Sequence, residues 1–426
     1  MPYQIINELK KKNIYKDFYF ALRKVNKNYD FIRHELYYSI HYKKKGFNFV
    51  NTIIAFLRDC YIGIGKQTLN NSDIKKIFFF TINGLSGLKT LIYHHKFDTK
   101  QLIKIDLKRN KKISTYKLKA SLDISFFKFF IKVFKSIHWK KNDSLLIFIY
   151  CLRLSFWASV WNSFILKSNN SNQEIFIHND FDIYNSSLIY ILNKKFINKD
   201  IKIFCIQHGI PTDEFFPTKS VDYLVWSKMM EELFIKGNKE YENDSTLYTI
   251  DNSSNRFNKN FLDERKTYLN VEKSIYFISQ GHTKIYGEKV NKDLINFCVE
   301  SSSLLSNFYC LLHPTETIKN NNYPITLNDK IIQGPHNFNR EKENIKIYVS
   351  FCSTAIIDIM LNNHLVIGID IHPTTSLLAF KYFKPQLSVK NPKELDLLVK
   401  KITNDREYLI DLLIKQKKYL TELIGQ

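Results

Sequence analysis

Short apolar runs alternate with longer stretches of helical spacing along most of the chain. The clearest run, 203–206, leads directly into a Gln-His-Gly turn and a proline at 207–211. A buried parallel strand that ends in a sharp turn has this pattern. A second run, 223–226, ends at Ser227, which we expect to cap the helix that follows it. Strands that alternate with helices in this way predict a parallel, Rossmann-like sheet of the α/β class.

The remaining apolar runs fall into two series, with a polar stretch between them. Residues 238–265 are rich in Asn, Asp, Ser and Lys and lack sustained periodicity, so they are the natural connection between two domains. Residues 1–70 have mostly helical spacing and are basic, and a second helical region covers 124–168. The further strands that we expect are 76–81, 173–178, 274–282, 307–314, 329–335, 345–353 and 364–370.

These elements define the expected domain organisation. A Rossmann-like domain should cover 1–240, with residues 1–70 as an extra helical region, and a linker should cover 241–265. A second Rossmann-like domain should cover 266–400, followed by a C-terminal helix over 401–426. Two such domains make a cleft, and ligands are expected to bind there.

One stretch, 144–166, is long and apolar enough to cross a bilayer, which takes about 20 residues. Arg153 would then lie near the centre of the membrane, at a cost of about 2.5–3.5 kcal/mol. We therefore expect a buried or interfacial helix. The N-terminal residues lack an apolar signal-peptide core, so we do not expect export. The six cysteines show no metal-binding spacing and mostly sit in apolar runs, which is typical of a protein in a reducing cytoplasm.

The chain is strongly basic. Its 63 Lys and Arg residues outnumber 41 Asp and Glu residues, for a net charge of +22. The charge predicts attraction to anions, but no nucleic-acid motif accompanies it, so we expect no nucleic-acid partner. The inner face of the cytoplasmic membrane is an anionic surface of the right kind. We expect peripheral association there, with the aromatic segment around Trp157 and Trp161 as a contact.

In the first half, candidate chemistry follows two strands. His208 ends one of them and could exchange a proton with a substrate, or it could simply hydrogen-bond the backbone of its own turn. Asp180 and Asp182 follow the preceding strand. If these strands are neighbours, all three side chains lie on one rim of the sheet.

In the second half, three strand ends carry polar residues. His313-Pro314 follows one strand, and Gln280-Gly281 follows another, where the glycine permits close approach of a ligand to the backbone. Ser353 and Thr354 stand between a strand and a helix. As N-cap residues they would leave backbone N–H groups and the positive end of the helix dipole facing a phosphate, or they could be an ordinary helix cap.

Taken together, the strand–His-Pro and strand–Ser/Thr–helix elements resemble bacterial GT-B glycosyltransferases of surface-polysaccharide biosynthesis. The pattern is most similar to the bacterial sialyltransferases, with their His-Pro and Ser-Ser/Thr motifs, and to the CDP-glycerol glycerophosphotransferases. The Gln-His-Gly element, with the preceding strand and its Asn-Asp-Phe-Asp, also resembles surface-polysaccharide and Kdo transferases of the same fold. The resemblance covers roughly 170–375. It implies a GT-B fold, in which two Rossmann-like domains face a central cleft, with the acceptor bound by the N-terminal domain and the nucleotide donor by the C-terminal domain.

The resemblance also implies roles for the candidate residues. His313 would bond the donor phosphate or ribose, and Ser353 and Thr354 would bond the phosphate. Gln280, Gly281 and Pro314 complete the expected donor-binding set. For the general base there are two alternatives. The acidic motif of the sialyltransferases favours Asp180, followed by Asp182, although its glycine is missing here, whereas the glycerophosphotransferases have a His-Gly pair that His208-Gly209 matches.

The function that these features favour is inverting transfer of a sugar, with sialic acid from CMP-sialic acid ahead of other donors. The acceptor would be a cell-surface glycan of the O-antigen, capsule or lipooligosaccharide kind, free or lipid-linked. The nucleotide sugar is a substrate, and we expect no cofactor and no bound metal, although the Asp180-x-Asp182 pair leaves metal use open. The alternatives are a polyol-phosphate transferase that uses CDP-glycerol, a non-hydrolysing sugar epimerase, and a non-catalytic protein that binds polyanions or membranes.

Overall fold

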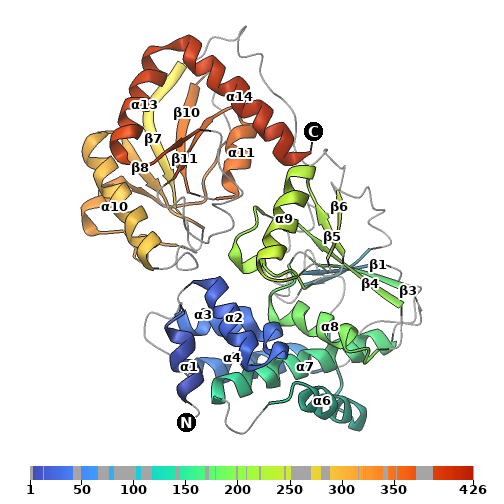
Figure 1. The fold of residues 1–426 in the computed structure, drawn as a ribbon. Coiled ribbons are helices and arrows are strands. Elements are labelled where there is room, and N and C mark those ends of the chain that lie inside the picture. The colour runs from blue at the N-terminus through green and yellow to red at the C-terminus, as the bar shows by residue number, and fades with distance from the viewer. Residues whose placement is uncertain are drawn as a thin grey trace. The chain divides into compact units, whose positions relative to one another are not determined.

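The computed structural model divides the chain into two compact units, each described here by itself (Figure 1). The first unit comprises Met1–His208, Glu214–Val225 and Phe234–Ser253, and the second comprises Gly209–Asp213, Trp226–Leu233 and Ser254–Gln426. The structure describes residues 3–12, 14–41, 49–65, 76–80, 102–106, 118–139, 144–167, 172–177, 179–197, 200–207, 209–219, 222–243, 246–250, 270–279, 288–314, 316–319, 321, 323–338, 344–351, 353–370 and 387–425.

The first unit begins with helices, as the spacing of its apolar residues predicts. Aromatic side chains such as Tyr15, Phe18 and Tyr37 are fully buried between these helices. Ring centroids of Tyr15 and Tyr37 lie 4.8 Å apart, and those of Phe18 and Tyr37 lie 5.1 Å apart, in edge-to-face contacts that favour this packing. The helices are α1 (Tyr3–Lys10), α2 (Tyr15–Val25), the 3-10 helix η1 (Lys27–Ile32), α3 (Arg33–His41), α4 (Phe49–Gly63), α6 (Ile124–Ser136) and α7 (Leu145–Lys167).

Helix α7 is the apolar stretch that is long enough to cross a membrane, and it is the one described helix that meets this test. Of its most apolar window, 78% is buried inside the protein. Arg153 donates through Nε to Asp59 Oδ2 at 2.6 Å, so its charge is compensated within the core. These contacts agree with the expected buried helix. The expected membrane contact at Trp157 and Trp161 is wrong, because both side chains are fully buried.

The first sheet has six parallel strands in the order β2-β1-β3-β4-β5-β6. Sequence patterns predict β1, β3, β4 and β5, whereas β2 and β6 are additional. Leu247–Ile250 pairs with β5 inside the region expected to be a linker, so the sheet extends further than the polar composition indicates. As an edge strand with alternating exposed positions, it needs few apolar residues. The strands are β1 (Lys76–Phe80), β2 (Leu102–Asp106), β3 (Asn172–Ile177), β4 (Asp200–Ile206), β5 (Asp222–Val225) and β6 (Leu247–Ile250).

Two helices accompany the strands of the first sheet. Asp182 caps α8 (Ile183–Asn193), because its Oδ1 accepts a hydrogen bond from Asn185 N at 2.8 Å. Ser227 caps α9 (Lys228–Glu240) as expected, with Oγ accepting from Met230 N at 3.1 Å. The same hydroxyl donates to the carbonyl of Leu423 at 2.8 Å.

The second sheet is also parallel, with the order β12-β11-β10-β7-β8-β9. From β7 the chain crosses to β8 in one direction along the sheet, and from β10 it crosses to β11 in the opposite direction. Because both connections are right-handed, their helices α10 and α11 lie on opposite faces of the sheet. Helix α10 packs against α13, and α11 packs against α14 and β11 (Figure 1). The elements are β7 (Asn270–Ile278), α10 (Glu288–Leu304), β8 (Phe308–Leu311), η5 (Ile325–Lys330), β9 (Ile331–Ile332), β10 (Asn344–Ser350), α11 (Ala355–Leu361), β11 (Leu365–Ile369), β12 (Ser388–Val389), α13 (Pro392–Asn404) and α14 (Arg406–Ile424).

Candidate functional site

The strand order of the second sheet defines where a ligand is expected. The chain runs from β7 through β8 to β9 on one side, then returns to β10 and continues through β11 to β12 on the other side. This is the order of Rossmann dinucleotide-binding sheets, whose ligands bind outside the carboxyl ends of the strands where the order reverses. Here that point lies between β7 and β10.

Two of the predicted motifs follow strands at this point, and a third strand ends there at Ser279, the residue before Gln280. Ser279 follows β7, His313-Pro314 follows β8, and Ser353-Thr354 follows β10. Because β8, β7 and β10 are adjacent and parallel, their carboxyl ends share one edge of the sheet. The sheet therefore brings together the described members of the predicted donor set, whereas Gln280 and Gly281 lie outside the described residues.

A buried carboxylate organises the His-Pro loop. Glu316 is only 7% exposed, and its Oε2 accepts hydrogen bonds from the Ser279 hydroxyl at 2.5 Å and from the backbone N of His313 at 2.9 Å. Its carbonyl accepts from the side-chain amide of Gln333 at 2.9 Å. Tyr323 OH donates to Ser279 Oγ at 2.8 Å. Glu316 therefore ties the loop after β8 to the end of β7 and fixes the backbone at His313.

The loop after β10 is held by its own hydroxyl groups. Ser350 Oγ accepts from Ser353 N, and Ser353 Oγ accepts from Ala355 N, both at 3.3 Å. Thr354 occupies the N-cap position of α11, but its hydroxyl makes no capping bond to the helix. The local hydroxyl interactions expected at this helix start are thus made by Ser353, while Thr354 points to another partner.

That partner is the segment Gly209–Asp213, which follows the Gln-His pair in the sequence. Thr354 Oγ1 accepts a hydrogen bond from the backbone N of Ile210 at 3.1 Å, and Gly209–Asp213 belong to the same unit as Thr354. A Cβ atom built on Gly209 would lie 3.0 Å from Thr354 Oγ1, so the glycine permits the close approach of the two segments. His208 itself lies outside the described residues.

In the first sheet, Asp180 and Asp182 also follow a strand where the order reverses. The chain runs from β1 to β2 on one side and from β3 to β4 on the other. Strands β3 and β4 are parallel neighbours, with Ile177 paired to Cys205, as expected for the strands that precede the two aspartates and His208. The prediction that these strand ends share one rim of the sheet is confirmed.

The two aspartates have different surroundings. Both are buried, with exposed fractions of 1% for Asp180 and 3% for Asp182. Asp182 caps α8, as described above, which is a structural role. Asp180 accepts through Oδ2 a hydrogen bond from the backbone N of Lys219 at 2.5 Å. This contact fixes the Asp180 carboxylate against a segment that lies 39 residues away in the sequence.

Lys219 adds a buried ammonium group beside Asp180. Its Nζ donates to Ser186 Oγ at 3.1 Å, and Ser186 Oγ donates in turn to the carbonyl of Asp180 at 3.1 Å. Arg33 Nη2 donates to the carbonyl of Pro217 at 3.2 Å in the same region. Burial, and then the positive charge of Arg33, lower the pKa of Lys219 to about 8. The sequence offers no signal for this group, because a single lysine in a loop is usually solvated.

Replacing Lys219 should change the pH dependence of stability. Between the pKa of about 8 in the folded protein and the higher value of an unfolded lysine, the unfolded chain binds more protons. The free energy of unfolding should therefore rise with pH across this window, by about 3 kcal/mol in wild type. In Lys219→Met this contribution should be absent, and the variant should be the more stable one near neutral pH. Urea unfolding between about pH 7 and pH 10 tests this. The exposed Lys239→Met is the matched control, and a Lys219→Met slope equal to that of wild type would contradict the prediction.

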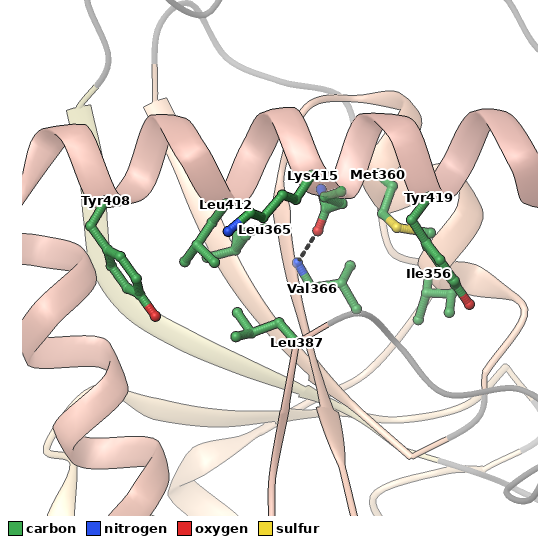
Figure 2. A pocket seen from close by; sticks show the side chains of 10 residues that line it. Ile356, Met360, Leu365, Val366, Leu387, Tyr408, Leu412, Lys415 and Tyr419 are labelled. Atoms are coloured by element: carbon green, nitrogen blue, oxygen red, sulfur yellow. Dashed lines mark hydrogen bonds between the residues drawn. The ribbon is translucent and has the colours of Figure 1, made fainter.

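Within the described ranges, no group of three or more His, Cys, Asp and Glu side chains could hold a metal ion. A cavity of about 390 Å³ lies under α14, between α11 and the edge of β11 (Figure 2). The Gln416 side chain bonds the β11 backbone there, accepting from Val366 N at 2.8 Å and donating to the carbonyl of His364 at 2.7 Å. Mostly apolar side chains line this cavity, and the ten lining residues shown include no predicted donor residue.

The sequence matches no protein-family model, and no curated protein matches it. Several solved structures are similar. A putative UDP-N-acetylglucosamine 2-epimerase from Listeria monocytogenes is 9% identical, with a TM-score of 0.41, over 83% of this chain and 91% of that chain. The wall teichoic acid polymerase TagF, in a structure with CDPG, is 12% identical, with a TM-score of 0.40, over 88% of this chain and 91% of that chain. HepE from Anabaena, in complex with UDP and glucose, is 8% identical, with a TM-score of 0.41, over 83% of this chain and 96% of that chain.

The sequence motifs do not indicate two further candidate residues, Lys219 and Glu316. Lys219 carried no local signal, as noted. Glu316 stands three residues after His313, a spacing at which a carboxylate can accept from the backbone N–H at the start of a turn. This spacing was available in the sequence, and with the strand end before it, it could have marked Glu316.

Proposed function

We propose that this protein is an inverting glycosyltransferase that uses a nucleotide-sugar donor, with CMP-sialic acid as the favoured donor. The acceptor would be a cell-surface glycan, free or lipid-linked. The observation that carries the proposal is the convergence of His313 and the Ser353-Thr354 pair at the carboxyl edge of one parallel sheet, next to the point where its strand order reverses. In this proposal, residues that are 40 positions apart in the sequence would face the same ligand.

The chemistry of this edge suits a leaving nucleotide phosphate. In glycosyl transfer the bond between the sugar and the phosphate breaks, and negative charge grows on the phosphate oxygens. Hydroxyl donors from Ser353 and Thr354 and an imidazole donor from His313 would stabilise that charge, which is the main catalytic demand of the reaction. Glu316 supports the site indirectly, because it holds the backbone of His313 in place.

The acceptor hydroxyl needs a general base, and we propose Asp180 for this role. It stands at the point of order reversal in the first sheet, and Asp182 is engaged in capping α8. Direct attack of the acceptor oxygen on the anomeric carbon, with loss of its proton to the base, inverts the configuration. The reaction balances without a cofactor, since the nucleotide leaves with the electron pair of the broken bond.

A second candidate function is polyol-phosphate transfer from a donor such as CDP-glycerol. The hydrogen bond from Ile210 N to Thr354 Oγ1 favours it, because it brings the backbone next to the His-Gly pair against the donor motif. In that reaction His208 would act as the base. Release of CMP from CDP-glycerol, and not from CMP-sialic acid, distinguishes this function from the first.

Donor-site variants test the proposal through binding. His313→Ala and the double change Ser353→Ala, Thr354→Ala should each weaken nucleotide affinity by about 10- to 150-fold, because a lost hydrogen bond to a charged phosphate costs about 1.5–3 kcal/mol. Calorimetric titration with CMP, CDP, UDP and GDP gives the affinities and identifies the nucleotide. The matched control is the double change Ser302→Ala, Ser303→Ala on α10, whose hydroxyls bond the carbonyl of Val299. Unchanged affinity for every nucleotide in both donor-site variants would overturn the assignment.

A further inference from the structure

Helix α4 presents an apolar row to solvent. Val50, Ile54, Leu57 and Tyr61 recur at intervals of three and four residues, and they are 58%, 54%, 59% and 70% exposed. At 3.6 residues per turn they form a single line along the helix. The opposite side of α4 is buried, including Asp59 beside Arg153 of α7. A surface helix normally turns its polar side outward, so this helix has its apolar row on the unusual side.

Helix α6 shows the same feature with a basic border. Ile124, Phe127 and Ile131 are 74%, 50% and 49% exposed, while Phe126 and Val133 on the opposite side are buried. Three exposed lysines run alongside the apolar row, less than a quarter turn around the helix. These are Lys128, Lys132 and Lys135.

The two rows lie on helices that both pack against α7. Phe56 of α4 and Phe126 of α6 both contact Phe156 of α7, with ring centroids 6.2 Å and 5.9 Å apart. The end of α4 is bonded to the segment that leads into α6, since Ala120 N donates to the carbonyl of Gly63 at 2.8 Å. Helices α4, α6 and α7 lie together in Figure 1. We call the two rows together with Leu122 the α4–α6 face, made of Val50, Ile54, Leu57, Tyr61, Leu122, Ile124, Phe127 and Ile131.

The charge around this face is mainly positive, and Asp123 is the one exposed carboxylate among the described residues of α4, α6 and 118–123. Within α4, α6 and residues 118–123 the carboxylates are Asp59 and Asp123. Asp59 is buried against Arg153, and Asp123 caps α6 by accepting from Phe126 N at 2.8 Å. Arg58 and the three lysines of α6 are exposed. Two copies of the face would bring like charges together, whereas an anionic lipid surface complements both its charge and its apolar rows.

We propose that the α4–α6 face binds the surface of an anionic bilayer, with the apolar rows at the boundary between headgroups and acyl chains and the basic side chains among the headgroups. This role differs from the membrane contact that the sequence indicates, because the residues involved are exposed side chains of α4 and α6 rather than the buried tryptophans of α7. It is independent of the donor chemistry. Binding of this kind seats the protein on the membrane without spanning it.

Sedimentation of the full-length protein with vesicles tests the proposal. Wild type should bind phosphatidylcholine vesicles that contain phosphatidylglycerol, bind pure phosphatidylcholine vesicles much more weakly, and be released by high salt or alkaline wash. The pair Ile54→Gln, Leu57→Gln and the triple change Lys128→Gln, Lys132→Gln, Lys135→Gln should each reduce the partition coefficient by about tenfold or more. Circular dichroism should be unchanged, because all five side chains are exposed.

Matched controls alter the same chemistry in the second unit. They are Leu397→Gln, at a leucine that is 67% exposed, and the triple change Lys289→Gln, Lys393→Gln, Lys418→Gln, which removes the same charge. Both should bind vesicles as wild type does. Wild type that does not bind anionic vesicles, face variants that bind as well as wild type, or controls that weaken binding equally would each overturn the proposal. So would a concentration-dependent dimer that Ile54→Gln, Leu57→Gln abolishes while vesicle binding is absent, because the face would then be a self-association surface.

Discussion

Asp180→Asn should lower turnover under saturating donor by about 10²- to 10⁴-fold, the usual cost of removing a general base, while donor affinity stays nearly unchanged. The substitution keeps the shape of the side chain and an oxygen that can accept from Lys219 N, so the fold should survive. Turnover is measured as nucleotide release in the presence of acceptor, with donor affinity from calorimetry. The expected result is a loss in the chemical step alone.

The neighbouring aspartate supplies the control for this experiment. Asp182→Asn makes the same chemical change two residues away, and asparagine caps helices as well as aspartate does, so α8 should be preserved. We expect a smaller loss than for Asp180→Asn. If both asparagine variants keep wild-type turnover while His208→Ala is inactive, His208 is the base, and polyol-phosphate transfer becomes the favoured reaction.

Asp59→Ala should destabilise the first unit by about 3–5 kcal/mol, because it removes the closest partner of the buried Arg153 guanidinium and leaves Glu35, 3.5 Å away, as its remaining carboxylate. Asp59 is fully buried, Arg153 is 2% exposed, and their closest atoms lie 2.6 Å apart. Tyr184 OH also donates to Asp59 Oδ1 at 3.2 Å. Denaturant unfolding followed by tryptophan fluorescence reports this change, since Trp157 and Trp161 are buried on the same helix, α7.

Two comparisons identify the cause of that loss. The double change Asp59→Ala, Arg153→Met should recover most of the lost stability, since it also removes the buried charge that Asp59→Ala leaves with Glu35 alone. Asp411→Ala breaks the exposed pair with Lys415, whose side chains are 53% and 56% exposed, and should change stability little, as is usual for exposed ion pairs. If the double variant were as unstable as Asp59→Ala, the ion pair would not be the source of the effect.

Much of the architecture follows from local sequence. Apolar runs such as 203–206 and 364–370 form strands because their side chains are buried by helices on both faces of a parallel sheet. Ser227 caps α9 as its position predicts, because the cap needs only residues within one turn. The apolar pattern does not predict strands β2 and β6. They lie at the edge of their sheet, where neighbours and not apolar composition define them.

The candidate site shows the same division. The sequence by itself determined that His313, Ser353-Thr354, Asp180 and Asp182 follow strands, because apolar periodicity and turn chemistry are local properties. Only the tertiary structure decided which of these strand ends are neighbours, that Glu316 holds His313, and that Lys219 is buried beside Asp180. It also decided that Trp157 and Trp161 face the core, while the apolar row of α4 faces solvent. The physical reason is that helical spacing identifies the two sides of a helix, but only the packing of distant segments determines which side is buried.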